Sequence, residues 1–125
     1  MLQKFGVADG NALLLTCSGA SNVGQLSHQA VVELAQEGFG KFHCLAGIGA
    51  HLSKFVQGAK DNPDIVVIDG CPIGCAKKIV EHAEISASKY LVVTKLGIEK
   101  NYILKTKEDE VEKVKQAVKN LYQER

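Results

Sequence analysis

The feature that most constrains the fold is an alternation of short apolar segments with longer amphipathic ones. Four short segments are predicted to be buried strands: 12–17, 41–46, 64–70 and 89–95. Segments with apolar side chains at helical spacing follow them: 22–37, 50–60, 75–83 and 108–123. Apolar strands that are separated by helices indicate a parallel sheet covered on both faces. The sequence therefore predicts a three-layer α/β/α fold, flavodoxin-like or Rossmann-like, with a four-stranded, mainly parallel sheet.

The length and the lack of long apolar runs limit the kind of protein that this chain can form. A chain of 125 residues can bury one hydrophobic core but not two, so we expect a single domain over residues 1–125. Residues 1–11 are expected to be a loose lead-in. No segment of the sequence approaches the run of about eighteen apolar residues that a membrane span requires. We therefore expect a soluble, cytoplasmic protein that does not bind a membrane.

The charged residues are nearly balanced. Fifteen Lys and Arg residues stand against fourteen Asp and Glu residues, which gives a formal net charge of +1. A nucleic-acid surface usually needs a clustered excess of basic residues, so we expect no nucleic-acid partner. The sequence leaves open whether the protein has a protein partner or associates with itself.

The four cysteines follow the repeat of strands and helices. Cys17 and Cys44 are 27 positions apart, as are Cys44 and Cys71, and each is predicted to lie where a strand ends and a helix follows. Cys75 lies in the first turn of the next predicted helix. Buried packing would explain one such cysteine, but not three at equivalent positions. Because the carboxyl ends of parallel strands meet at one edge, we expect all four thiols there, with Cys17 central if the strand order is 2-1-3-4.

Four thiols at one edge of a sheet suit a tetrahedral zinc ion. Zn²⁺ binds thiolate sulfur at about 2.3 Å, and loops at adjacent strand ends can meet that geometry. Helix N-termini that face the same edge would supply backbone N–H groups and positive dipole ends, so we expect lowered thiol pKa values. These groups would also offset a net charge of about −2 on a zinc tetrathiolate.

Three sequence motifs resemble those of a known family: "CSGASNVGQ" at 17–25, "CLAGIG" at 44–49 and "IDGCPIGCAKK" at 68–78. The chain resembles the DGC-domain family, whose members are proposed to bind zinc. Its name refers to the Asp-Gly-Cys that stands here as Asp69, Gly70 and Cys71. The resemblance implies a metal site and does not imply a particular reaction. It implies four metal ligands: Cys17, Cys44, Cys71 and Cys75.

Other thiol chemistry remains open for the same residues. Cys71 and Cys75 are close enough in sequence to form a disulfide or to carry a persulfide in a sulfur relay. Four thiolates could also hold an iron–sulfur cluster. Cysteine-dependent phosphatase or arsenate reductase chemistry is less consistent with the sequence, because such sites use an Arg in the anion loop and the only Arg is Arg125.

Two glycine-containing loops are similar to nucleotide-binding motifs but lack the required residues. The segment 19–26 has Gln25 and Leu26 where a phosphate loop has Lys and Ser or Thr, and 47–52 lacks the third glycine of a dinucleotide fingerprint. Asn22 and Gln25 resemble a helix capping box instead. Ser18, Ser21 and Asn22 are expected to cap a helix or donate to sulfur, and Gly47 and Gly49 to form a tight turn.

The remaining chemistry-bearing residues are assigned mainly structural roles. Asp69 is expected to accept hydrogen bonds from its loop, with an ion pair to Lys77 or Lys78 or a role as a base for metal-bound water as the alternatives. His51 is expected to be a surface or capping residue, with a place near the metal as the alternative. His43 is expected to pack on the face of its strand opposite Cys44. His28 and His82 are expected to be exposed on helices.

Overall fold

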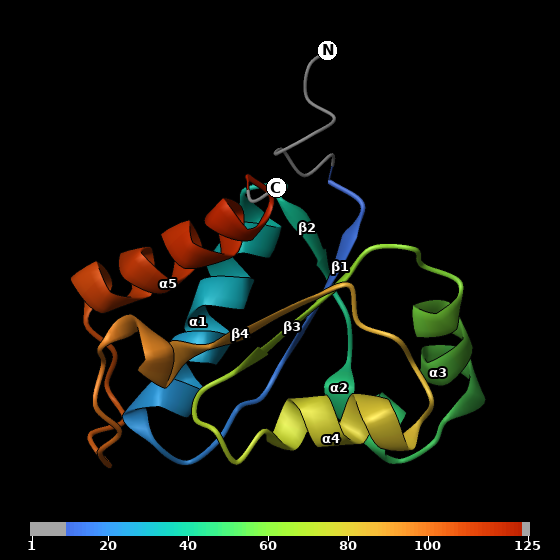
Figure 1. Ribbon diagram of the computed structural model, residues 1–125, viewed down its shortest axis with the longest axis horizontal. Helices are drawn as coiled ribbons and strands as arrows, with labels where there is room; N and C mark the ends of the chain where they lie inside the picture. Colours follow the sequence, from blue (N-terminus) through green and yellow to red (C-terminus); the bar gives the residue numbers. More distant parts are fainter. Residues whose placement is uncertain (1–9, 124–125) are drawn as a thin grey trace.

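The computed structural model describes residues 10–123 as a parallel sheet with helices on both faces (Figure 1). The sheet has four strands: β1 (Ala12–Thr16), β2 (Gly40–Phe42), β3 (Ile65–Asp69) and β4 (Lys89–Val92). Their order is β2-β1-β3-β4, and every neighbouring pair is parallel. This confirms the predicted three-layer α/β/α class and the strand order on which the cysteine argument depended. The predicted lead-in at 1–11 lies outside the described residues, except for residues 10 and 11.

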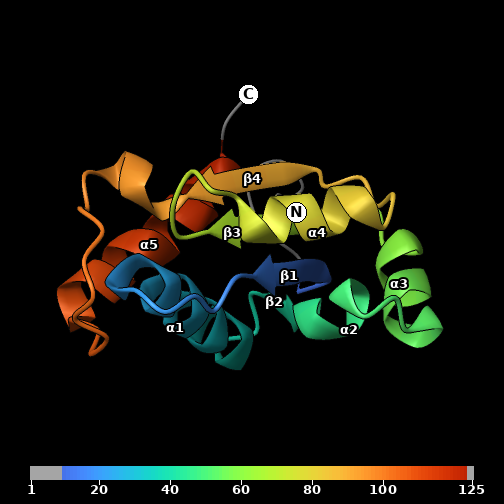
Figure 2. The same cartoon turned by 90° about the horizontal axis from the view of Figure 1, so that it is seen from below.

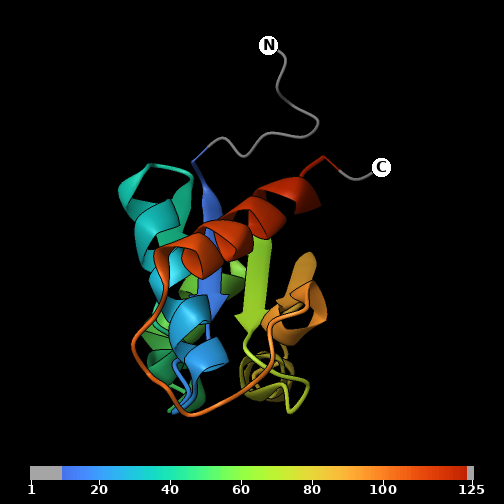
Figure 3. The same ribbon diagram turned by 90° about the vertical axis from the view of Figure 1, so that its left-hand side faces the viewer.

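The helices divide between the two faces of the sheet. They are α1 (Asn22–Gln36), α2 (Leu45–Gly49), α3 (Ser53–Lys60), α4 (Cys75–His82) and α5 (Glu108–Leu121), with a short 3-10 helix, η1 (Val93–Leu96). Helices α1 and α5 cover one face, whereas α2, α3 and α4 lie on the other (Figures 2 and 3). Among residues 10–123, no helix is long and apolar enough to cross a membrane.

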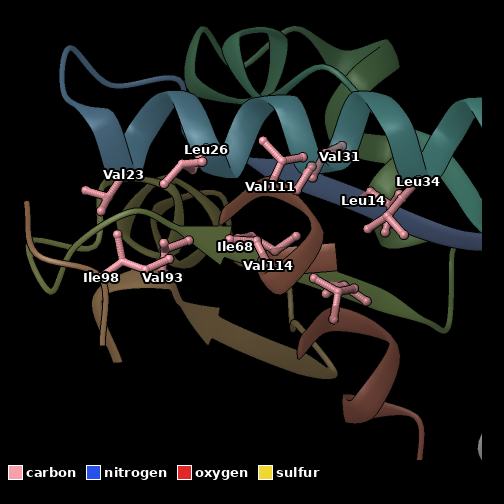
Figure 4. Close-up of a cluster of buried hydrophobic side chains, with 13 residues drawn as sticks. Leu14, Val23, Leu26, Val31, Leu34, Ile68, Val93, Ile98, Val111 and Val114 are labelled. Atoms are coloured by element: carbon pink, nitrogen blue, oxygen red, sulfur yellow. The ribbon is translucent and has the colours of Figure 1, made fainter. Parts of the chain in front are cut away.

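Each face of the sheet has its own hydrophobic core, because successive side chains of a strand point to opposite faces. Leu14 of β1 packs with side chains of α1 and α5, and Figure 4 shows it near Leu34. Its neighbours Leu13 and Leu15 belong to the second core, with Ile48 of α2 and Val80 of α4. The central strands are buried on both sides, which fixes their register and therefore the positions of the loops that follow them.

Two predicted strands are shorter than expected. The segment 41–46 was predicted to be one strand, but β2 ends at Phe42 and α2 begins at Leu45. The backbone N–H of Gly47 donates to Sγ of Cys44 at 3.3 Å, so Cys44 caps this short helix where a tight turn was expected. The segment 89–95 becomes η1 after Val92, because Val93 turns into the core between the sheet and α1 and α5.

The start of α1 also differs from the prediction. The cap is Ser21, whose hydroxyl accepts the N–H of Gly24 at 3.2 Å. The capping box at Asn22 was wrong, because Asn22 is the first residue inside the helix. Its side chain binds a segment that is distant in the sequence. It accepts the N–H of Asn101 at 2.6 Å and donates to the carbonyl of Glu99 at 2.8 Å. Asn22 thus ties the 99–101 segment to the start of α1.

Candidate metal centre

A cavity of about 470 Å³ lies at the carboxyl edge of the sheet. Its walls come from the loop between β1 and α1, the loop between β3 and α4, and the segment around Lys100 and Tyr102. Three of the four cysteines line it: Cys17, Cys71 and Cys75. All four cysteines fall within the described residues, and all are free thiols. The strand order therefore brings together at one cavity three thiols, two from loops and one from the start of α4.

Cys17 follows the central strand β1 and is partly buried. Its Sγ accepts the backbone N–H of Gly70 at 3.2 Å, which joins the β1 loop to the β3 loop. Burial raises the pKa of the Cys17 thiol; the N–H groups of Gly19 and Gly70 oppose this rise, and the negative charge of Asp69 adds to it. The expectation of a lowered thiol pKa was wrong for Cys17, because desolvation outweighs the backbone donors.

Cys71 and Cys75 lie on either side of the turn that leads into α4. Cys71 is partly buried against the core beneath α1 and α5, and the ammonium of Lys100 is 3.6 Å from its Sγ. Cys75 is exposed at the first position of α4. Gly74 between them adopts φ of 72°, in the left-handed region that favours glycine. This turn directs both thiols to the same cavity.

Cys44 lies at the same edge but is not among the residues that line the cavity. It follows β2 and caps α2, and the next residue, Leu45, does reach the cavity wall. Within residues 10–123, no group of three or more His, Cys, Asp or Glu side chains is in position to hold a metal ion. The thiols are thus near one another without forming a closed coordination site, and the assignment of zinc to them stays a prediction.

Asp69 ends β3 directly beneath the cysteine loop and is almost fully buried, with 1% of its surface exposed. Its carboxylate accepts the N–H groups of Ala76 and Lys77 at 2.8 and 3.0 Å and the hydroxyl of Tyr90 at 2.8 Å. This is the structural loop role that the sequence favoured. Burial, followed by the hydrogen bond to Asp69, raises the pKa of Tyr90. Sequence reasoning missed Tyr90, whose place within an apolar strand gave no sign of a polar contact.

Glycines allow the loop between β3 and α4 to approach the first turn of α1 closely, and that turn to approach the loop between β1 and α1. A Cβ on Gly70 would lie 2.7 Å from the backbone nitrogen of Gly24, and a Cβ on Gly24 would lie 2.6 Å from the carbonyl oxygen of Gly19. Real side chains do not tolerate such distances to backbone atoms. The absence of side chains at Gly24 and Gly70 therefore brings Cys17 and Cys71 to the same cavity.

The histidines do not line the cysteine cavity. The ring of His43 packs on Phe55 and its Nε2 lies 2.9 Å from the Phe55 carbonyl oxygen, in agreement with its predicted packing role. His28 was expected to be exposed but is partly buried, with its ring against Phe42. His82 is exposed on α4 as expected, and His51 faces it.

The fold and the site define a class: a parallel α/β domain with a cluster of thiols at the carboxyl edge of its sheet. The chain belongs to the DGC domain family, whose sequence profile matches residues 13–118. It is similar to the anaerobic and virulence modulator AnvM of Pseudomonas aeruginosa, with 31% identity over 90 residues, which cover 72% of this chain and 69% of AnvM. No solved structure matches the chain significantly.

Proposed function

We propose that the protein binds one Zn²⁺ ion through Cys17, Cys44, Cys71 and Cys75. The observation that carries this proposal is that three of these thiols line one cavity, with the fourth at the end of the neighbouring strand. Four thiols are the ligand set of structural zinc sites, and a metal would draw together side chains that already share one sheet edge.

The surroundings of the thiols support a negatively charged zinc tetrathiolate. Zinc ligands must be deprotonated, so a site of this kind needs nearby positive charge or N–H donors. The N–H of Gly70 already points at Sγ of Cys17, and the ammonium of Lys100 lies beside Sγ of Cys71. These groups would offset part of the charge of the complex.

Exposed ligands would make the bound metal exchangeable. Cys44 and Cys75 are exposed, so a change of side-chain rotamer at either position meets little steric resistance. To bind the metal, Sγ of Cys44 would give up the hydrogen bond that it accepts from the N–H of Gly47. A site that closes only when metal arrives suits delivery or sensing of zinc better than a permanent structural role.

A binding or regulatory role also fits better than catalysis. The three hydrogen bonds on the carboxylate of Asp69 leave it poorly placed to act as a base for metal-bound water. The name of the relative AnvM describes a modulator, and we extend that class of role to this chain. Thiol-redox chemistry, in which Cys71 and Cys75 form a disulfide and pass two electrons and two protons to an oxidant, is the second candidate, because both thiols line the same cavity.

The deciding experiment is elemental analysis with an absorption spectrum, on protein purified without oxygen and without added metal. We expect near one zinc per chain, no visible absorption, and loss of zinc in Cys71→Ser. The matched control is Tyr102→Phe, which changes an exposed residue that lines the cavity without removing a thiol and should keep the metal. Visible absorption with bound iron would indicate an iron–sulfur cluster. Metal-free protein whose thiols oxidise in pairs would replace the zinc proposal with the redox one.

A further inference from the structure

Two exposed histidines face each other beside the cysteine edge. Nε2 of His51, which follows α2, lies 3.1 Å from Nδ1 of His82 in the last turn of α4. Their ring centroids are 5.0 Å apart, with the ring planes inclined at 66°. They line a cavity of about 290 Å³, separate from the cysteine cavity, together with Gly49, Lys78 and Ile79.

The distance of 3.1 Å between the two nitrogens is close to that of two imidazoles on one metal ion. Zinc binds histidine nitrogen at about 2.0–2.1 Å, so two ligands at the tetrahedral angle have nitrogens about 3.3 Å apart. In the metal-free pair, the two nitrogens lie at hydrogen-bonding distance. A divalent ion bound to both would lie off the line between them, so each ring must turn its nitrogen toward the ion.

The end of α2 fixes the position of His51. His51 has φ of 58°, in the left-handed region that commonly ends a helix. Its N–H donates to the carbonyl of Ile48 at 2.9 Å, and the N–H of Leu52 donates to the carbonyl of Gly47 at 3.0 Å. This hydrogen-bonded cap holds the backbone that carries the His51 ring opposite His82. Glycine would fit the same backbone conformation without strain.

The histidine pair is close to the cysteine cavity. His82 is seven residues after Cys75, about two turns along the same side of α4. Ile79, between them on the helix, lines both cavities. Lys78 also lines the histidine cavity, and its positive charge weakens cation binding there. Two nitrogen ligands next to a lysine make a weak site that water must complete.

We propose that His51 and His82 form a second, weaker site for Zn²⁺ or a similar divalent transition-metal ion, next to the cysteine edge. The site uses imidazole ligands from two elements, and its existence does not depend on metal binding by the cysteines. An exposed, low-affinity site at this position is suited to capture a metal ion from solution.

The test is titration of reduced, metal-free protein with Zn²⁺ alone, followed by calorimetry and by NMR of the imidazole resonances. We expect a binding event that shifts the resonances of both His51 and His82 and that weakens at least tenfold in His82→Ala. The matched control is His28→Gln, which removes an imidazole on α1 and should bind like the wild type. The proposal would be overturned if this binding event had the same affinity in His82→Ala, or if Zn²⁺ shifted the resonances of neither His51 nor His82.

A second variant separates metal binding from a purely structural role of the pair. His51→Gly removes a ligand while placing glycine at a positive φ, so we expect unfolding stability equal to or above that of the wild type together with the same loss of binding. Retention of the weak binding event in His51→Gly would contradict the proposal. The same titrations in a Cys71→Ser background distinguish the two sites: a weak event lost only with His82 supports the histidine site even if the cysteines bind nothing.

Discussion

The hydroxyl of Tyr90 in β4 donates a 2.8 Å hydrogen bond to the buried carboxylate of Asp69 at the end of β3. The same carboxylate accepts two backbone N–H groups from the first turn of α4, the helix that begins with Cys75. Asp69 therefore couples the sheet edge to the position of that thiol. It is the Asp of the Asp-Gly-Cys motif, and its observed contacts are structural.

Removal of the Tyr90 hydroxyl should destabilise the fold. We expect Tyr90→Phe to lower the free energy of unfolding by about 1.5–3 kcal/mol, the range for a hydrogen bond to a charged group. Urea unfolding measures this change. Tyr102→Phe is the matched control, because Tyr102 lines the cysteine cavity but is 76% exposed, and it should unfold like the wild type. Equal stability of Tyr90→Phe and the control would show that the hydrogen bond contributes little.

Asp69→Asn should loosen the start of α4. The amide nitrogen of Asn cannot accept a hydrogen bond, so at least one of the donors at Ala76, Lys77 and Tyr90 loses its partner, at a cost of about 1–3 kcal/mol. Compared with the wild type, this variant should show a larger increase in amide hydrogen exchange in the first turn of α4 than in α5. An equal change in the two helices would argue against a local role for Asp69.

The close approach of the loop between β3 and α4 to the first turn of α1 should not tolerate a methyl group at Gly70. A Cβ there would lie 2.7 Å from the nitrogen of Gly24, so Gly70→Ala should cost about 1–3 kcal/mol of stability and displace the loop that carries Cys71. Gly19→Ala is the control in the same region, because its Cβ would meet no atom within 4 Å. Thermal unfolding and zinc content of the two variants test this. A Gly70→Ala protein that matches Gly19→Ala in both measurements would contradict it.

The ion pairs of the buried ammonium of Lys115 should make the free energy of unfolding depend on pH. Lys115 has 6% of its side chain exposed and pairs with Glu33 and Glu37, which joins α5 to α1. Hydrogen bonds lower the pKa of both glutamates below 4.5. Glu33 accepts from Gln29, which has the larger effect, and from Lys115. Glu37 accepts from Lys115. Because the pKa of each glutamate is lower in the folded protein than in the unfolded chain, the ionised glutamates stabilise the fold, fully so above pH 4.5. This contribution to stability should be lost as the pH falls below 4.5 and through the folded-state pKa values.

Urea unfolding over that pH range in wild type and Glu37→Gln measures this dependence. Both glutamates are partly exposed, so solvent screening keeps the effect modest. The variant should show a smaller loss of stability in acid, since it lacks one of the groups that titrate. Identical pH profiles for the two proteins would show that the Glu37 pair does not contribute.

The four thiols should differ in reactivity in the metal-free protein. Cys44 and Cys75 are exposed, whereas Cys17 is partly buried and its burial raises its thiol pKa. Because the thiolate is the reactive form, Cys17 should be alkylated more slowly than the two exposed thiols. Peptide mass spectrometry after brief treatment with iodoacetamide gives the order. Cys17 modified first would show that the β1 loop opens more readily than its contacts suggest.

The sequence by itself determined the three-layer class and the edge at which the cysteines lie, whereas the strand order was a condition that the structure met. These follow from local information, because strands apolar on both faces must be covered by helices and the 27-residue spacing repeats one strand and one helix. The structural role of Asp69 was also predicted, since a carboxylate at the end of a buried strand has few other stable arrangements.

Only the tertiary structure decided how the edge is built. The helix α2 exists because Cys44 can cap it and because Gly47 leaves room for the ring of Phe55, a contact between separate segments. The contacts of Lys100 with Cys71 and of His51 with His82 join residues about thirty positions apart. Spacing in a sequence places residues at an edge, but distances between side chains there depend on loop packing, which only the folded chain determines.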